Sequence, residues 1–268
     1  MEQPIFSALK VEIEDRLARI TLNRPERLNA LSVSMLKEII ELAAWLNTRD
    51  DLRVVVLSGA GRSFCAGFDL ENFSRSGDDA SDRNISSRDS AELGRLATDA
   101  WTDIKQISVV AVQGHCVGGG VVLVGACDIR LAAIDAMFSV PEVDLGIPLA
   151  WGGIPRLVRE IGPAFTKELV LTCRPFTASE AQSMGFINRV VGADELSSQV
   201  ESLAFSLANK PLYALRTTKA QVNAVMEEIA GTGRSAADAD GLVYAMHDPE
   251  SRAASARYLS QRRTRDNR

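Results

Sequence analysis

Three successive glycines, Gly118, Gly119 and Gly120, are the first residues whose type and spacing could serve chemistry. A backbone without side chains lets a ligand approach its amide groups closely. At the start of a helix, such amides also favour negative charge, so the segment could bind a phosphate or stabilise an oxyanion. No Gly-Lys-Ser/Thr follows, and the spaced glycines of a dinucleotide site are lacking. The run alone is a weak signal, because close helix–strand packing also needs glycine.

A second segment, residues 64–70, reads Phe-Cys-Ala-Gly-Phe-Asp-Leu and follows an apolar run expected to be a buried strand. Gly67 immediately precedes Phe68, so the backbone there is also open to a close approach. An oxyanion hole with two amide donors requires two backbone sites that a carbonyl oxygen can approach closely. The two glycine segments, each after an expected strand, provide two such sites.

The elements that must position these segments follow from apolar periodicity. Alternating runs at 9–13 and 17–22 predict a hairpin. Ser32 predicts the N-cap of a helix to about residue 47. A polar stretch at 74–90 predicts a mobile surface loop, as a solvated connection rather than a lid. Other strands are expected at 54–57, 109–112, 128–131 and 137–140, and other helices at 91–106, 118–125, 195–207, 212–229 and 235–261.

Strands alternate with helices to about residue 192, and helices alone follow. This order predicts an α/β fold class, with a core at 1–192 and an α-helical region at 193–268.

Composition excludes several classes of function. The chain has 268 residues and a formal net charge of -5, and no stretch gathers enough Lys and Arg to bind nucleic acid. The two histidines, His115 and His247, are far apart, and the four cysteines have no metal-ligand spacing, so we expect no metal and buried thiols. No signal peptide or apolar run of about 18 residues is seen, so we expect no membrane span and a cytoplasmic location.

Five segments, in order and in register, resemble the enoyl-CoA hydratase/isomerase (crotonase) superfamily. They are residues 23–25 with 28–31, 63–70, 114–120, 141–143, and 178–181 with 185–191. The resemblance covers nearly the whole chain. It implies a spiral of ββα units and C-terminal helices that assemble a homotrimer or a dimer of trimers. It also implies an acyl-CoA thioester as substrate, with coenzyme A as part of that substrate and no separate cofactor.

The same resemblance implies a role for individual residues. The backbone N–H groups of Phe68 and Gly119 would be the oxyanion donors, and Glu142, after Pro141, would be a catalytic carboxylate. In isolation, Glu142 would be an ordinary exposed carboxylate; its register with the two glycine segments favours catalysis. The coenzyme A arm would lie along Arg27, Leu28, Ala66, Asp69 and Leu70.

One position departs from the hydratase pattern. Hydratases of this superfamily carry a second glutamate two residues after the glycine triplet, where this chain has Val122. Valine can neither orient water by a charged hydrogen bond nor accept a proton. Asp144, Asp69 and His115 are candidate substitutes, although a structural role is favoured for each.

One carboxylate suffices to shift a double bond, because the same base can remove a proton from C2 and return one to C4. We therefore expect a one-base enoyl-CoA isomerase. A hydratase with a substitute base and a non-catalytic acyl-CoA-binding protein remain alternatives, as do other reactions on the same oxyanion hole. Trp151 is equally consistent with packing and with contact to the acyl group.

Overall fold

The protein is described by a computed structural model that covers residues 3–69 and 87–266, with side chains to residue 261. Most of the predicted loop at 74–90 therefore lies outside the described residues. Its end does not form a loop, because helix α3 (Ser87–Thr102) begins there. Arg88 Nε donates to Asp240 Oδ1 at 2.7 Å, which ties this first turn to a helix near the C-terminus.

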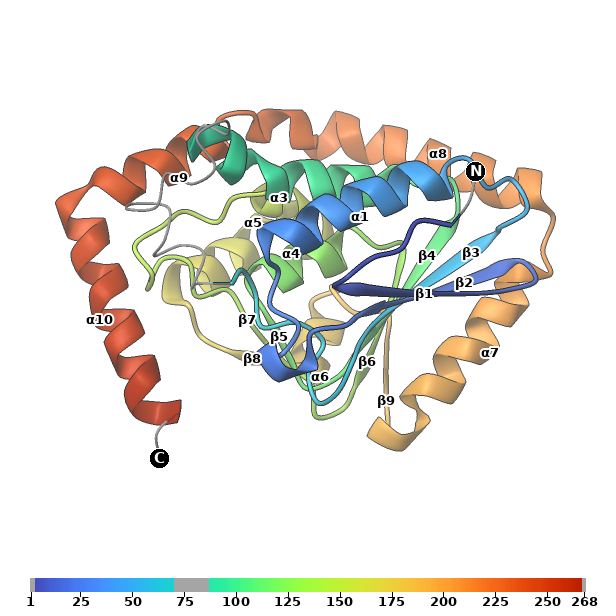
Figure 1. Ribbon diagram of the computed structural model, residues 1–268, viewed down its shortest axis with the longest axis horizontal. Helices are drawn as coiled ribbons and strands as arrows, with labels where there is room; N and C mark the ends of the chain where they lie inside the picture. The colour runs from blue at the N-terminus through green and yellow to red at the C-terminus, as the bar shows by residue number, and fades with distance from the viewer. Residues whose placement is uncertain (1–2, 70–86, 267–268) are drawn as a thin grey trace.

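A six-stranded sheet runs through the centre of the molecule in the order β1-β2-β3-β4-β6-β9 (Figure 1). Its strands are β1 (Leu9–Glu14), β2 (Leu17–Leu22), β3 (Val54–Gly59), β4 (Ile107–Val112), β6 (Ile129–Ala133) and β9 (Arg189–Val191). The first two form the predicted antiparallel hairpin, and every other neighbouring pair is parallel. A second sheet has the order β5-β7-β8, from β5 (His115–Val117), β7 (Met137–Ser139) and β8 (Phe176–Thr177).

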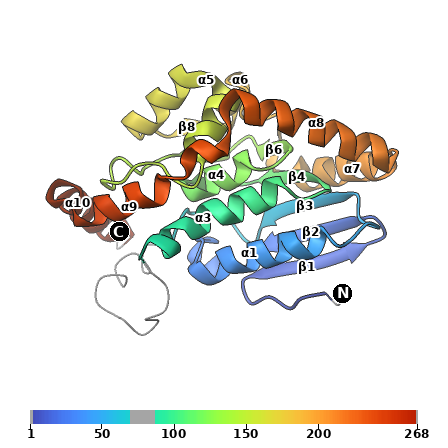
Figure 2. The same ribbon diagram turned by 90° about the horizontal axis from the view of Figure 1, so that it is seen from above.

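Strand alternation divides the core into two layers. Val55 and Leu57 of β3 face one apolar cluster, while Val54 and Val56 face another. The first cluster lies under α1 (Val33–Leu46) and α3, which run side by side over one face of the sheet (Figures 1 and 2). The second lies under α7 (Leu196–Ala208), on the opposite face.

Side chains that cap the backbone fix several helix ends, and the predicted cap at Ser32 is confirmed. Ser32 accepts a hydrogen bond from the backbone N–H of Met35 at 3.1 Å and caps α1. Thr177 forms a capping box with Glu180 at the start of α6 (Ala178–Ser183). The predicted helix at 91–106 instead ends at Thr102, because the buried Gln106 donates to the backbone at the end of α1 and holds the chain out of the helix.

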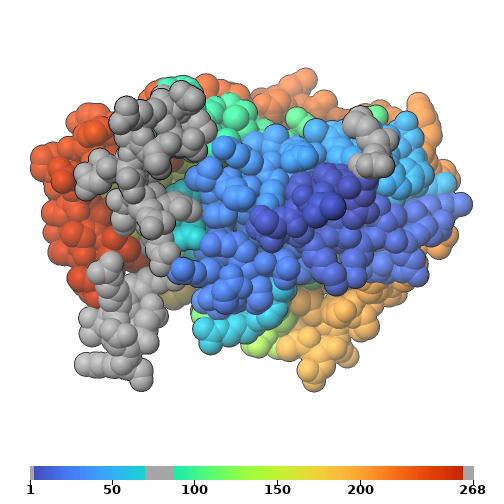
Figure 3. All heavy atoms as spheres, viewed as in Figure 1, coloured from blue at the N-terminus to red at the C-terminus, as the bar shows by residue number. Residues whose placement is uncertain are grey.

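The C-terminal part is helical, with one correction. Besides α6 and α7, its α-helices are α5 (Gly153–Thr172), α8 (Leu212–Ala230), α9 (Asp238–His247) and α10 (Pro249–Asp266). The single helix predicted at 235–261 is broken at Asp248, which is extended because the residue before proline disfavours helical geometry. In Figure 3, α10 forms one end of the molecule, and the N-terminal hairpin lies on the face turned towards the viewer.

The predicted α/β fold class is confirmed. The predicted division at residue 192 stays a prediction, and α7, which follows it, packs directly on the sheet. Within the described part of the chain, no helix is both long and apolar enough to cross a membrane.

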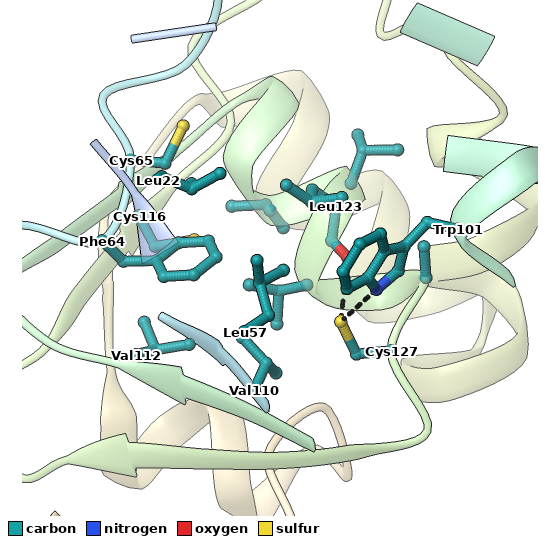
Figure 4. Packing of buried hydrophobic residues seen from close by; sticks show 14 of the residues in the cluster. Leu22, Leu57, Phe64, Cys65, Trp101, Val110, Val112, Cys116, Leu123 and Cys127 are labelled. Atoms are coloured by element: carbon teal, nitrogen blue, oxygen red, sulfur yellow. Dashed lines mark hydrogen bonds between the residues drawn. The ribbon is translucent and has the colours of Figure 1, made fainter. Parts of the chain in front are cut away.

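The predicted buried thiols are confirmed: all four cysteines are free and buried. Figure 4 shows Cys65 and Cys116 near Phe64, and the indole N–H of Trp101 donating to Cys127 Sγ at 3.2 Å. Burial raises the pKa of Cys65 and that of Cys127 to about 12, so these thiols pack as apolar groups at neutral pH.

The side chain of Asn29 holds together the loops that lead into the site. Its Nδ2 donates to the carbonyls of Ala60 and Ser63, and its Oδ1 accepts from the backbone of Arg24, at distances of 2.8 to 2.9 Å. Its φ of 55° also suits asparagine better than alanine. We expect Asn29→Ala to lower the free energy of unfolding by roughly 2–4 kcal/mol in urea titrations. The exposed Asn209→Ala is the control, at less than about 0.5 kcal/mol; equal effects would contradict the role assigned to Asn29.

Candidate active site

Backbone pairing brings the two glycine segments together. Cys65 forms a parallel bridge with Cys116 in β5, in which Cys65 N donates to His115 O and Val117 N donates to Cys65 O, both at 3.0 Å. The chain at Gly67 has a φ of 88° and approaches so closely that a Cβ there would lie 3.0 Å from Val117 O. Gly67 therefore lies beside the residue that leads into the glycine triplet.

The two predicted oxyanion donors have free amides. A bridge to Leu31 uses Gly67 O, which accepts from Leu31 N, and Asp69 N, which donates to Leu31 O. This bridge does not use the N–H of Phe68, which lies between them. Gly119 is the first residue of α4 (Gly119–Gly125), where an amide has no partner within the helix. Among the described residues neither amide has a hydrogen-bond acceptor, which leaves both available to a carbonyl oxygen.

Glu142 lies on a turn after β7, with its carboxyl group against Gly118. A Cβ at Gly118 would lie 2.4 Å from Oε1, so only glycine admits the carboxyl group there. The residue as a whole is half-buried, but its Oε2 is shielded from solvent and has no hydrogen-bond partner among the described residues. Desolvation raises the pKa of Glu142 to about 7, partly opposed by a hydrogen bond from its own backbone N–H. A carboxyl group with this pKa can both accept and donate a proton near neutral pH.

Val122, at the position of the missing glutamate, is an apolar core residue. It is 2% exposed and lies in the main hydrophobic cluster. A Cβ at Gly153 would lie 2.9 Å from both Val122 Cγ2 and Leu149 Cδ2, so the start of α5 packs tightly over this side chain. The position therefore supplies neither a charge nor a hydrogen bond to the site.

The three candidate substitute bases have other environments. Asp69 forms an ion pair with Arg24 at 2.9 Å. Asp144 is exposed on a turn in which Leu145 N donates to Pro141 O, so it does not share a strand face with Glu142. His115 is exposed and belongs to β5.

The predicted coenzyme A residues come together around one backbone contact. Ala66 N donates to Leu28 O at 2.9 Å, and Arg27 ends the short helix η1 (Pro25–Arg27) just before it. Asp69 lies on the adjoining bridge to Leu31, and Leu70 lies outside the described residues. Contact with coenzyme A stays a prediction for all five.

Sequence reasoning missed two glycine contacts of the site. Gly118 was identified only as part of the triplet, and its role beside the carboxyl group of Glu142 depends on a turn that the pattern does not fix. Gly94, in α3, packs against Trp151. An isolated glycine in a helical pattern signals close packing, so Gly94 could have been flagged, but not its partner.

Comparisons with known proteins identify the family of the chain. A family model described as enoyl-CoA hydratase/isomerase matches residues 12–265. The chain belongs to this family. A peroxisomal Delta(3,5)-Delta(2,4)-dienoyl-CoA isomerase of Arabidopsis thaliana is 36% identical over 79% of this chain and 79% of its own length. A crotonyl-CoA hydratase of Syntrophomonas wolfei is 34% identical over 91% of this chain and 92% of its own.

The fold agrees as well. The crystal structure of an enoyl-CoA hydratase/isomerase from Mycobacterium paratuberculosis superposes with a TM-score of 0.84 at 27% identity, over 93% of this chain and 98% of that one. The expected crotonase-like fold of this family member is therefore confirmed. Both isomerases and hydratases occur among its relatives, so its own reaction must be argued from its site.

The raised pKa of Glu142 predicts how stability depends on pH. Its pKa of about 7 in the folded protein exceeds the ordinary 4.5, so the folded state holds the proton more tightly, and stability is lost as pH rises from 4.5 through 7. Glu142→Gln removes this loss and should stabilise the protein more at pH 8 than at pH 4.5, by up to roughly 3 kcal/mol. Denaturant titrations at the two pH values measure the difference.

Glu180→Gln is the control, because its effect on stability should depend on pH in the opposite direction. The pKa of Glu180 is lowered by its hydrogen bond from the Thr177 backbone, so its contribution is present above pH 4.5 and lost below. Equal pH dependence for Glu142→Gln and the unmodified protein would contradict burial of the carboxyl group.

Gly118→Ala tests whether the carboxyl group of Glu142 acts from its position against Gly118. The added methyl would overlap Oε1 of Glu142, and the φ of 49° at this position strains any side chain. We expect kcat to fall by about 10²-fold or more, since a small displacement of a catalytic group is costly. Gly125→Ala is the control, because its Cβ would meet nothing closer than 3.6 Å. A Gly118→Ala protein as active as Gly125→Ala would show that the carboxyl group does not act from this place.

Proposed function

We propose that the protein is an enoyl-CoA isomerase that moves a double bond with one base, Glu142. The observation that carries the proposal is a single buried carboxyl group beside Gly118, with the aliphatic Val122 where a second glutamate would stand. The thioester carbonyl oxygen would accept hydrogen bonds from Phe68 N and Gly119 N, whose amides are free among the described residues.

The reaction then needs two proton transfers and no other group. The Glu142 carboxylate removes a proton from C2 of a β,γ-unsaturated acyl-CoA, and the electron pair of that bond delocalises as a dienolate. The two amides stabilise the negative oxygen of the dienolate. The carboxylic acid then returns the proton to C4, which yields the α,β-unsaturated thioester and restores the carboxylate. A pKa of about 7 for Glu142 suits both steps.

Hydration is the second candidate, because a crotonyl-CoA hydratase is among the relatives. Adding water to C3 requires a group that orients and deprotonates the water while a proton reaches C2. Val122 cannot do this, Asp69 is held by Arg24, and Asp144 is exposed. These environments favour isomerisation. A non-catalytic acyl-CoA-binding role is disfavoured by the buried, high-pKa Glu142.

Substrate recognition and assembly follow the family expectation. Arg27, Leu28, Ala66, Asp69 and Leu70 would contact coenzyme A, which belongs to the substrate, and no separate cofactor is needed. We also propose a cytoplasmic homotrimer or dimer of trimers. Apolar side chains exposed on α8 support an assembly: Val222 at 52%, Val225 at 55% and Ile229 at 68%.

An activity comparison tests the proposed reaction. Purified protein should convert 3-hexenoyl-CoA to 2-hexenoyl-CoA at least about 10²-fold faster than it hydrates crotonyl-CoA, since hydration lacks its second base. Glu142→Gln should lower isomerisation by about 10²–10⁴-fold. Asp144→Asn is the matched control and should leave both rates within about twofold, because an exposed carboxylate away from the reacting atoms contributes little.

Two results would overturn the proposal. Isomerisation undiminished in Glu142→Gln would reject the one-base mechanism. Fast hydration that is lost in Asp144→Asn would establish a hydratase with a substitute base.

A further inference from the structure

Trp151 stands beside both residues proposed to hold the thioester. It is 9% exposed, and its ring meets that of Phe68 edge-on, with centroids 5.7 Å apart and an angle of 89° between the planes. Its six-membered ring also reaches the backbone of Gly119, where a Cβ would lie 2.3 Å from Cζ3. The indole therefore occupies the space next to both oxyanion segments.

The indole also lies against the backbone of α3. A Cβ at Gly94 would lie 1.9 Å from Cε2 and 2.0 Å from Cδ2, so only glycine at this position admits the ring. Gly94 and Gly119 come from different helices, and the same indole fills the space that a side chain at either position would occupy. Because protein interiors are close-packed, a side chain seated this tightly has little freedom to move.

The backbone of Trp151 is fixed as well. Its φ of 62° is uncommon for a bulky residue and is held by the surrounding structure. The carbonyl oxygen of Trp151 accepts from Thr98 Oγ1 at 3.0 Å and from Arg156 Nη1 at 3.3 Å. The next residue, Gly152, donates its N–H to Asp238 Oδ2 at 2.9 Å. Elements α3, α5 and α9 thus hold one strained residue in place.

We propose that Trp151 is a specificity-determining residue that ends the acyl pocket and restricts the enzyme to short acyl groups. The inference rests on the proposed function, because the amides of Phe68 and Gly119 must hold the thioester carbonyl for the acyl carbons to extend from this point. We place those carbons between the carboxyl group of Glu142, which lies against Gly118, and the indole, which lies against Gly119. A rigid side chain there accepts a short acyl chain and rejects a longer one, by about tenfold or more in kcat/KM for each methylene that does not fit.

The acyl chain-length preference of Trp151→Ala tests whether the indole ends the acyl pocket. The unmodified enzyme should prefer 3-butenoyl-CoA and 3-hexenoyl-CoA over 3-decenoyl-CoA in kcat/KM. Removal of the indole should raise the ratio of the ten-carbon to the four-carbon kcat/KM by about tenfold or more. A folded Trp151→Ala protein with an unchanged ratio would overturn the proposal, and so would an unmodified enzyme that already prefers the ten-carbon substrate.

Binding of saturated analogues separates this inference from the proposed reaction. Calorimetry with butanoyl-CoA and decanoyl-CoA measures chain-length preference without turnover, and Trp151→Ala should improve decanoyl-CoA affinity relative to butanoyl-CoA by about tenfold. If the unmodified protein does not isomerise but Trp151→Ala shows this change in relative affinity, the proposed reaction is wrong and the role of Trp151 in chain-length selection is supported. If the unmodified protein isomerises but this change is absent, the role of Trp151 is wrong and the reaction stands.

Gly94→Ala provides a second variant, in which Trp151 itself is unchanged. Alanine favours a helix over glycine, but the methyl here would push the indole towards Gly119. We expect at least a tenfold loss of kcat/KM even for 3-butenoyl-CoA, with recovery in the Gly94→Ala/Trp151→Ala double variant. Trp45→Phe, a buried aromatic of α1, is the control and should not change the chain-length ratio. Full activity in Gly94→Ala would contradict the role assigned to Trp151.

Discussion

The short parallel pairing between residues 64–68 and β5 is the constraint on which the rest of the site depends. It consists of main-chain hydrogen bonds from Cys65 to His115 and from Val117 to Cys65. These bonds place Gly67 against Val117 and so fix where the amides of Phe68 and Gly119 lie relative to each other. Neither amide is used in the pairing, and neither has an acceptor within residues 3–69 and 87–266, so both are available to a ligand there. Preorganised donors of this kind need no rearrangement when charge develops on an oxygen.

The environment of the carboxyl group follows from the same close packing. Gly118 admits the Glu142 carboxyl group because it lacks a side chain, and the shielding of Oε2 raises its pKa to about 7. In a hydratase a second charged group would share such a site. Here the aliphatic Val122 stands at that position, in the main hydrophobic cluster, and packs with Leu149 against Gly153.

Local signals predicted much of the fold. The alternating hairpin and the Ser32 cap each depend on residues close in sequence, and each is confirmed. The break at Asp248 could have been predicted from Pro249 alone, since proline biases the residue before it. The start of α3 could not, because it depends on contacts such as Arg88 with Asp240, far along the chain.

The same distinction holds for the site. Motif register identified Phe68, Gly119 and Glu142, but not that Gly118 receives the carboxyl group or that Gly94 and Gly119 receive one indole. Those are contacts between helices and turns distant in sequence, and no periodicity specifies them. The fixed position of Trp151 similarly depends on Thr98 and Asp238, which local sequence does not connect to it.

The central claim is that one shielded carboxyl group carries the proton from C2 to C4. It is tested most directly by isomerising 3-hexenoyl-CoA deuterated at C2 in ordinary water and locating the label in the product by NMR. Because Oε2 of Glu142 is shielded from solvent, part of the deuterium should appear at C4. A product whose new C4 hydrogen comes entirely from solvent would contradict transfer by a single shielded base.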